Sequence, residues 1–68
     1  MAYDVIIRSP QGTYCDMRNL SSVRAREEIS SVYDSTQDKK LIVHIAIAKE
    51  RQISFDDDGY YVSITTVE

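Results

Sequence analysis

Hydrophobic and polar residues alternate near both ends of the chain, a pattern typical of β-strands. Residues 3–8 and 13–17 alternate in this way, and Pro10 and Gly12 lie in the short stretch that separates them. Proline fixes φ for a turn and glycine accepts a positive φ, so this stretch favours a hairpin over residues 3–17. The alternation returns at 51–55 and 60–67, on either side of a second turn-forming stretch.

The pattern changes to helical spacing over residues 21–34. Its apolar positions recur three and four residues apart and form one stripe: Ala25, Ile29, Val32 and Tyr33. Such a stripe predicts an amphipathic helix, with Tyr33 in the core. Ser21 stands where an N-cap is needed, because its hydroxyl can accept a hydrogen bond from a free backbone N–H of the first turn.

The longest apolar run is residues 41–48, interrupted only by His44. It is short for a buried helix, and four of its residues are β-branched, which favours a central strand. In a strand both of its faces would be largely apolar. One face would lie under the helix, and the other would need a cover from loops, a second copy of the chain or a different protein.

The expected fold is one α+β domain covering residues 1–68. The predicted order is ββαβββ, with a mostly antiparallel sheet and one helix packed on one face. This order carries no activity by itself.

Composition limits the possible classes of protein. A chain of 68 residues buries a small core, and its one cysteine, Cys15, cannot form an internal disulfide. Oligomerisation, for example as a homodimer, is one remaining source of stability. The first residues do not resemble a signal peptide, and no run approaches the length of a membrane span. We therefore expect a soluble cytoplasmic protein that does not insert into a membrane.

The sequence contains no set of residues that predicts catalysis. Cys15 and His44 could lie on neighbouring strands, but nucleophilic catalysis also needs an orienting group and an oxyanion site. Three consecutive aspartates, at 56–58, do not have the alternating spacing of a calcium loop. We expect no enzyme activity, no catalytic residues, no metal and no cofactor.

The preferred hypothesis is a non-enzymatic module that binds another protein. The net charge is −3, and the acidic excess lies entirely in residues 41–68. An acidic turn could contact a basic partner, and tyrosine is enriched at interfaces. The predicted partner-binding residues are Asp56, Asp57, Asp58, Tyr14 and Tyr61. A small inhibitor or regulator encoded by a phage or mobile element is one concrete form of this hypothesis.

Two alternatives come from other classes of protein. The first is a nucleic-acid-associated protein that uses a basic patch on the helix side, formed by Arg24, Arg26, Lys39 and Lys40. Nearby acidic residues and the negative net charge weaken the field of such a patch, which argues against it. The second is a small enzyme, against which the lack of a paired acid and base argues.

Overall fold

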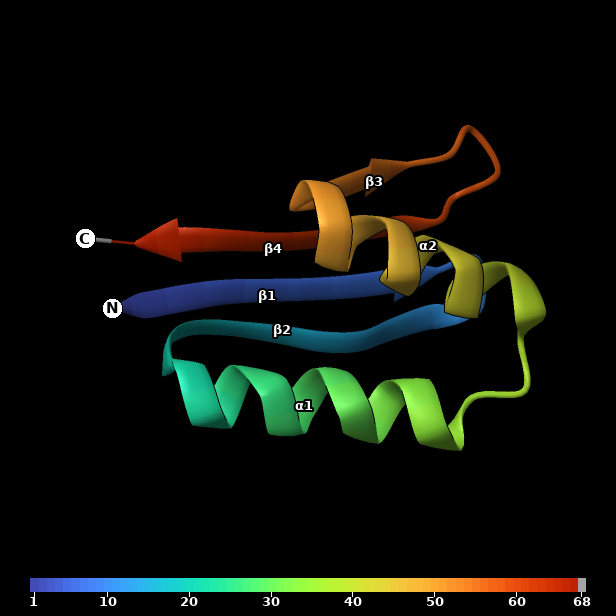
Figure 1. Cartoon of the computed structure of the whole chain (residues 1–68). Coiled ribbons are helices and arrows are strands. Elements are labelled where there is room, and N and C mark those ends of the chain that lie inside the picture. The colour runs from blue at the N-terminus through green and yellow to red at the C-terminus, as the bar shows by residue number, and fades with distance from the viewer. Residues whose placement is uncertain (68) are drawn as a thin grey trace.

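The computed structural model describes residues 1–67, in which four strands and two helices follow one another along the chain (Figure 1). The elements are β1 (Ala2–Ser9), β2 (Gly12–Ser21), α1 (Ser22–Ser35), α2 (Lys39–Arg51), β3 (Ile53–Phe55) and β4 (Tyr61–Val67). The α+β class is confirmed, and the order ββααββ differs from the predicted ββαβββ in one element.

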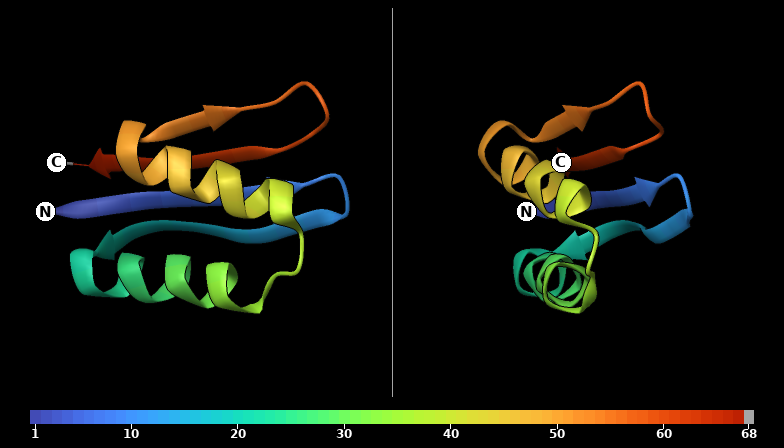
Figure 2. Two further views of the ribbon diagram at one scale, coloured as in Figure 1. Left: turned by 45° about the vertical axis from the view of Figure 1, so that its right-hand side comes forward. Right: turned by 90° about the vertical axis from the view of Figure 1, so that its right-hand side faces the viewer.

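The four strands form one sheet in the order β2-β1-β4-β3, and every neighbouring pair is antiparallel. Both helices lie on the same face of this sheet: α1 packs on β1 and β2, and α2 packs on β3 and β4 (Figure 2). Residues 1–67 therefore form two layers, and neither of their helices covers the other face of the sheet.

The central strand predicted at 41–48 is wrong, because these residues belong to α2. Its buried positions follow helical spacing: Leu41, His44, Ile45 and Ala48. Val43 would share the large apolar face of a strand, but in the helix its side chain is 54% exposed. The predictions of a single helix and of a central strand with two apolar faces are therefore wrong as well.

Residues at both ends of α2 explain why a run rich in β-branched residues becomes helical. Asp38 is the N-cap, and its carboxylate accepts hydrogen bonds from the backbone N–H groups of Lys40 (3.1 Å) and Leu41 (3.3 Å). At the other end, Gln52 adopts a left-handed φ of 75°. Lys49 and Arg51 place positive charge at the C-terminal end of the helix dipole. These local signals and the buried stripe together outweigh the strand propensity.

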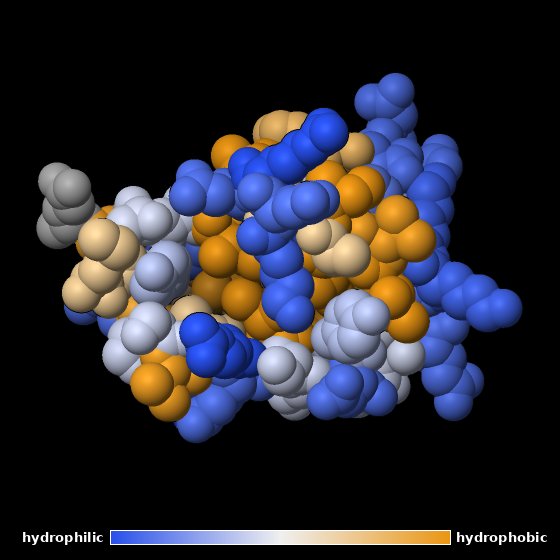
Figure 3. All heavy atoms as spheres, in the orientation of Figure 1, coloured by the Kyte–Doolittle hydropathy of each residue, from blue (hydrophilic) through white to orange (hydrophobic). Residues whose placement is uncertain are grey.

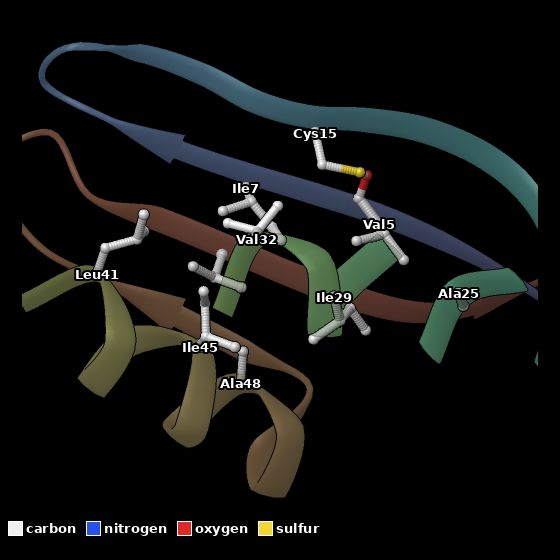
Figure 4. Packing of buried hydrophobic residues seen from close by; sticks show 10 residues of the cluster. Val5, Ile7, Cys15, Ala25, Ile29, Val32, Leu41, Ile45 and Ala48 are labelled. Atoms are coloured by element: carbon white, nitrogen blue, oxygen red, sulfur yellow. Dashed lines mark hydrogen bonds between the residues drawn. The ribbon is translucent and has the colours of Figure 1, made fainter. Parts of the chain in front are cut away.

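The core lies between the sheet and the two helices (Figure 4). Val5, Ile7 and Val62 from the sheet are fully buried, as are Leu41 and Ile45 from α2. The other buried apolar residues are Cys15, Ala25, Ile29, Val32 and Ala48.

Helix α1 agrees with the sequence prediction in its N-cap but not in the position of its tyrosine. Ser21 is the N-cap, and its Oγ accepts a hydrogen bond from Arg24 N at 3.2 Å. Tyr33, predicted in the core, is 39% exposed instead.

The two hairpin turns lie against each other at one end of the sheet. Gly59 has a φ of +92°, as expected for the turn between β3 and β4. A Cβ placed on it would lie 3.4 Å from Pro10 Cγ, in the turn between β1 and β2.

Candidate functional site

A group of polar side chains joins the first half of α2 to the hairpin of β3 and β4. We call it the α2 polar cluster, and it consists of Asp38, Lys40, His44, Ser54, Asp56, Asp58 and Tyr60. The spacing of Lys40 and His44 places both side chains on one side of the helix, facing the hairpin.

His44 lies at the centre of this cluster and is only 7% exposed. Its Nε2 lies 3.1 Å from a carboxylate oxygen of Asp56, and its Nδ1 is hydrogen-bonded to Ser54 Oγ. A carboxylate only accepts, so Nε2 donates to Asp56 in this arrangement. The tyrosine ring of Tyr60 stacks on the imidazole with a centroid separation of 5.6 Å.

Lys40 binds both ends of the acidic turn. Its ammonium lies 2.9 Å from a carboxylate oxygen of Asp56 and 2.7 Å from one of Asp58. The backbone N–H of Asp58 donates to Asp56 Oδ1 at 2.8 Å. This backbone hydrogen bond, followed by the ammonium, lowers the pKa of Asp56 to about 2, and the two carboxylates raise the pKa of Lys40.

The N-cap of α2 also belongs to the cluster. The Tyr60 hydroxyl donates to Asp38 Oδ2 at 2.6 Å, which lowers the pKa of the carboxyl group and raises that of the phenol. One carboxylate thus caps α2 with one oxygen and binds the residue that precedes β4 with the other.

The order of contacts from Ser54 through His44 to Asp56 resembles a nucleophile, a base and an orienting acid. Its surroundings do not suit that chemistry. Ser54 is 4% exposed and faces the helix, so a substrate carbonyl has no path to Oγ. Within residues 1–67, every buried side-chain nitrogen or oxygen has a hydrogen-bond partner. These paired contacts connect α2 to the hairpin of β3 and β4.

The three aspartates of the acidic turn, Asp56, Asp57 and Asp58, were predicted to bind a partner, and they differ in their surroundings. Asp56 is partly buried against His44, and Asp58 is exposed but paired with Lys40. Asp57 is exposed and forms no ion pair with any residue in 1–67. The acidic turn therefore offers an external partner less charge than its sequence indicates.

The four residues of the alternative basic patch are not brought together. Arg24 pairs with Glu28 at 2.8 Å on the first turns of α1, and Lys40 pairs with the acidic turn. Arg26 lies near the start of α1 and Lys39 at the start of α2, and Figure 1 shows these helix starts at opposite ends of the molecule.

Cys15 and His44 do not meet. The Cys15 thiol donates to the carbonyl oxygen of Val5 at 3.7 Å, while His44 contacts the hairpin of β3 and β4. Burial raises the pKa of the Cys15 thiol, which disfavours a reactive thiolate. Across residues 1–67 there is no cluster of side chains with the composition of a metal site.

The uncovered face of the sheet carries a second candidate site. Alternation places Ile6, Tyr61, Ile53 and Phe55 on the face opposite the buried Ile7, Val62 and Ser54. Ile6 and Ile53 flank Ser63 from the two neighbouring strands, and Tyr61 lies beside Phe55 with ring centroids 5.3 Å apart. We call Ile6, Ile53, Phe55 and Tyr61 the sheet patch.

Charged residues occupy the other half of the same sheet face. Arg18 on β2 lies 3.6 Å from a carboxylate oxygen of Asp4 and 3.9 Å from one of Asp16. Tyr14, predicted to bind a partner, is exposed on β2 at the register shift beside Cys15 and is not part of the sheet patch. Of the five predicted partner-binding residues, Tyr61 alone lies in this patch.

Comparison with known proteins adds no functional assignment: no protein family, curated protein or solved structure matches this chain. None of the helices formed by residues 1–67 has the length and apolar character needed to cross a membrane.

Proposed function

We propose that this protein is a non-enzymatic binding domain that docks onto another protein through the sheet patch. The observation that carries the proposal is Phe55, the one phenylalanine of the chain, whose side chain is 73% exposed on an edge strand. Exposed apolar groups that cluster on one face mark interaction sites more often than single exposed residues do.

The composition of the sheet patch suits a protein partner. Aromatic side chains are enriched at the centre of interfaces, and a few such anchors supply most of the binding free energy. Phe55 and Tyr61 supply two adjacent rings, and the Arg18 ion pairs supply a polar border across the sheet. Outside the Arg18 ion pairs, Arg8 opposite Tyr61 is the one exposed cation that residues 1–67 place on this face, which is less positive charge than binding of a nucleic acid requires.

The α2 polar cluster supports the non-enzymatic part of the proposal. It buries Ser54 of β3 against His44 of α2, and every buried side-chain nitrogen or oxygen of residues 1–67 is paired, which favours a structural role over turnover. A domain of this size can act as an inhibitor or regulator by occupying a surface of its target. Cys15 is a buried free thiol, which fits a protein of the reducing cytoplasm.

The test compares Phe55→Ser with a matched variant, Val23→Ser, which removes an exposed apolar side chain from α1. Each protein is immobilised, and the species retained from an extract of its own host cells are compared with those of the wild type. We expect one partner to be retained by wild type and Val23→Ser, with at least about tenfold lower recovery on Phe55→Ser.

Hydrogen exchange of the captured complex locates the interface independently. Protection should appear at the residues of the sheet patch and not on the helices. Equal recovery on Phe55→Ser, or protection confined to α1 and α2, would contradict the proposal.

A further inference from the structure

A groove lies between the two helices, on the face opposite the sheet patch. Its lining residues come from four elements: Tyr3, Ser22, Ala25, Arg26, Ile29, Lys49 and Ile64. Its volume is about 270 Å³, slightly below the roughly 300–1,000 Å³ typical of sites for drug-sized molecules, so it suits a smaller ligand. Figure 3 shows hydrophobic atoms at the centre of this face, with hydrophilic side chains around and above them.

The floor of the groove is apolar. Tyr3 and Ile64 rise from the central strands β1 and β4, where they are partly buried, and Ala25 and Ile29 face them from α1. This floor offers a short hydrocarbon or aromatic group a surface that excludes water.

The rim of the groove is basic on both sides. Arg26 belongs to α1 and Lys49 to α2, and both side chains are exposed. The Lys49 ammonium lies 5.5 Å from the centroid of the Tyr33 ring on α1, so this side chain reaches across from one helix to the other. Neither cation forms an ion pair with a carboxylate of residues 1–67.

We propose that this groove binds a small organic carboxylate with a short apolar body. The apolar body would lie on the floor, and the carboxylate would lie between Arg26 and Lys49. The volume favours a free small molecule over a protein segment. The two unpaired cations favour an anion over a neutral ligand.

The experiment titrates the isolated protein with octanoate, with its neutral analogue octanamide and with acetate, by two-dimensional NMR. Octanoate should saturate with a Kd near or below about 1 mM, and its shifts should map to the groove. Octanamide should bind at least about fivefold more weakly, since it lacks the charge, and acetate should not saturate because it lacks the apolar body.

Variants of the two rim residues distinguish binding of octanoate in the groove from its nonspecific attraction to any exposed cation. Arg26→Gln and Lys49→Gln should each weaken octanoate binding about fivefold. The control Arg8→Gln removes an exposed cation of the opposite sheet face and should leave the Kd unchanged. Both kinds of variant alter exposed side chains, and their circular dichroism should match the wild type.

Three outcomes would overturn the inference. They are the absence of saturable octanoate binding, equal affinity for octanoate and octanamide, and tighter binding of an acidic peptide than of octanoate in the same groove. Because these titrations use the groove and no protein partner, they do not depend on the outcome for the sheet patch.

Discussion

At the scale of single residues, a few side chains of the α2 polar cluster connect distant parts of the chain. Asp38 caps α2 and also accepts from Tyr60, 22 positions along the sequence. Asp56 receives hydrogen bonds from three directions: Lys40, His44 and the backbone of Asp58. Substituting one member of such a group leaves its buried neighbours without a hydrogen-bond partner. The stability of the fold is therefore sensitive to substitution of these residues.

The lowered pKa of Asp56 predicts a loss of stability in acid. Its folded pKa is about 2, below the usual 3.8, so the ionised carboxyl stabilises the folded state above about pH 4. That contribution is lost as the pH falls towards 2. In Asp56→Asn, the free energy of unfolding should be lower at neutral pH and should fall less between pH 4 and pH 2. Urea unfolding of both proteins across this pH range measures the free energy of unfolding.

Asp57→Asn is the matched control, since it removes a neighbouring exposed carboxylate that forms no ion pair within residues 1–67. It should follow the wild-type pH profile. A change in slope as large as that of Asp56→Asn would show that overall charge, and not the cluster, governs the acid response.

The positive φ of Gly59 predicts that a substitution at this position destabilises the fold through backbone strain and not through side-chain contacts. Its φ of +92° strains any residue with a Cβ, while the 3.4 Å distance to Pro10 is an ordinary contact. Gly59→Ala should therefore lower the free energy of unfolding by about 1–2 kcal/mol. Thermal unfolding measures the change, with Asp57→Ala in the same turn as a control that should stay within about 0.5 kcal/mol.

At the scale of elements, α2 offers the sharpest test of the fold. Leu41 is fully buried and Val43 is exposed, although a strand would place them on the same face. Leu41→Ala should lower the free energy of unfolding by about 2–5 kcal/mol. Val43→Ala should change it by less than about 0.5 kcal/mol. Similar large losses in both variants, measured by urea unfolding, would favour the strand.

The sequence predicted the elements that have strong local signals. The strands near both ends alternate with period two, and Pro10 and Gly59 mark turns. Ser21 marks the start of α1 by a hydrogen bond within one turn. Each of these signals depends on residues close in sequence, so it does not require knowledge of the tertiary structure.

The sequence predicts a strand over residues 41–48, where the structure has a helix, because two local signals conflict. Their β-branched residues favour a strand, while the stripe of Leu41, His44, Ile45 and Ala48 fits a helix. Asp38, followed by a run with this stripe, was the available signal for the helix start. The α2 polar cluster was missed for the same reason, since it forms only when Lys40 and His44 share one side of a helix.

The sheet patch was partly visible in the sequence. The alternation over residues 51–55 places Ile53 and Phe55 on one face, and the pairing across β3 and β4 agrees with this. That this face is free of helices could not be predicted, because it depends on α1 and α2 both packing on the other side of the sheet. The groove between the helices depends on the second helix in the same way.

At the scale of the whole molecule, the two apolar surfaces lie on opposite faces, so one copy could engage a small ligand and a protein together. The sheet patch consists of four side chains, a small part of the roughly 800 Å² that each partner buries in a standard interface, so a partner must also contact the residues around it. Since the proposed partner is a different protein, we expect the chain alone to be a monomer and not the homodimer considered from the sequence.

Light scattering across a concentration series measures the mass directly. A constant monomer mass fits a partner of a different sequence. A dimer that dissociates on Phe55→Ser would contradict this expectation and would show that a second copy covers the sheet patch.

The pairing of β1 with β4 has a mechanical consequence. Ala2 lies opposite Val67, so the two ends of the sheet's central pair are adjacent (Figure 1). A force that pulls these ends apart acts across the strands, and it opens their hydrogen bonds one after another, as in unzipping. The same pairing joins the half containing β2 and α1 to the half containing α2 and β3, so tension at the ends would separate the sheet along its middle.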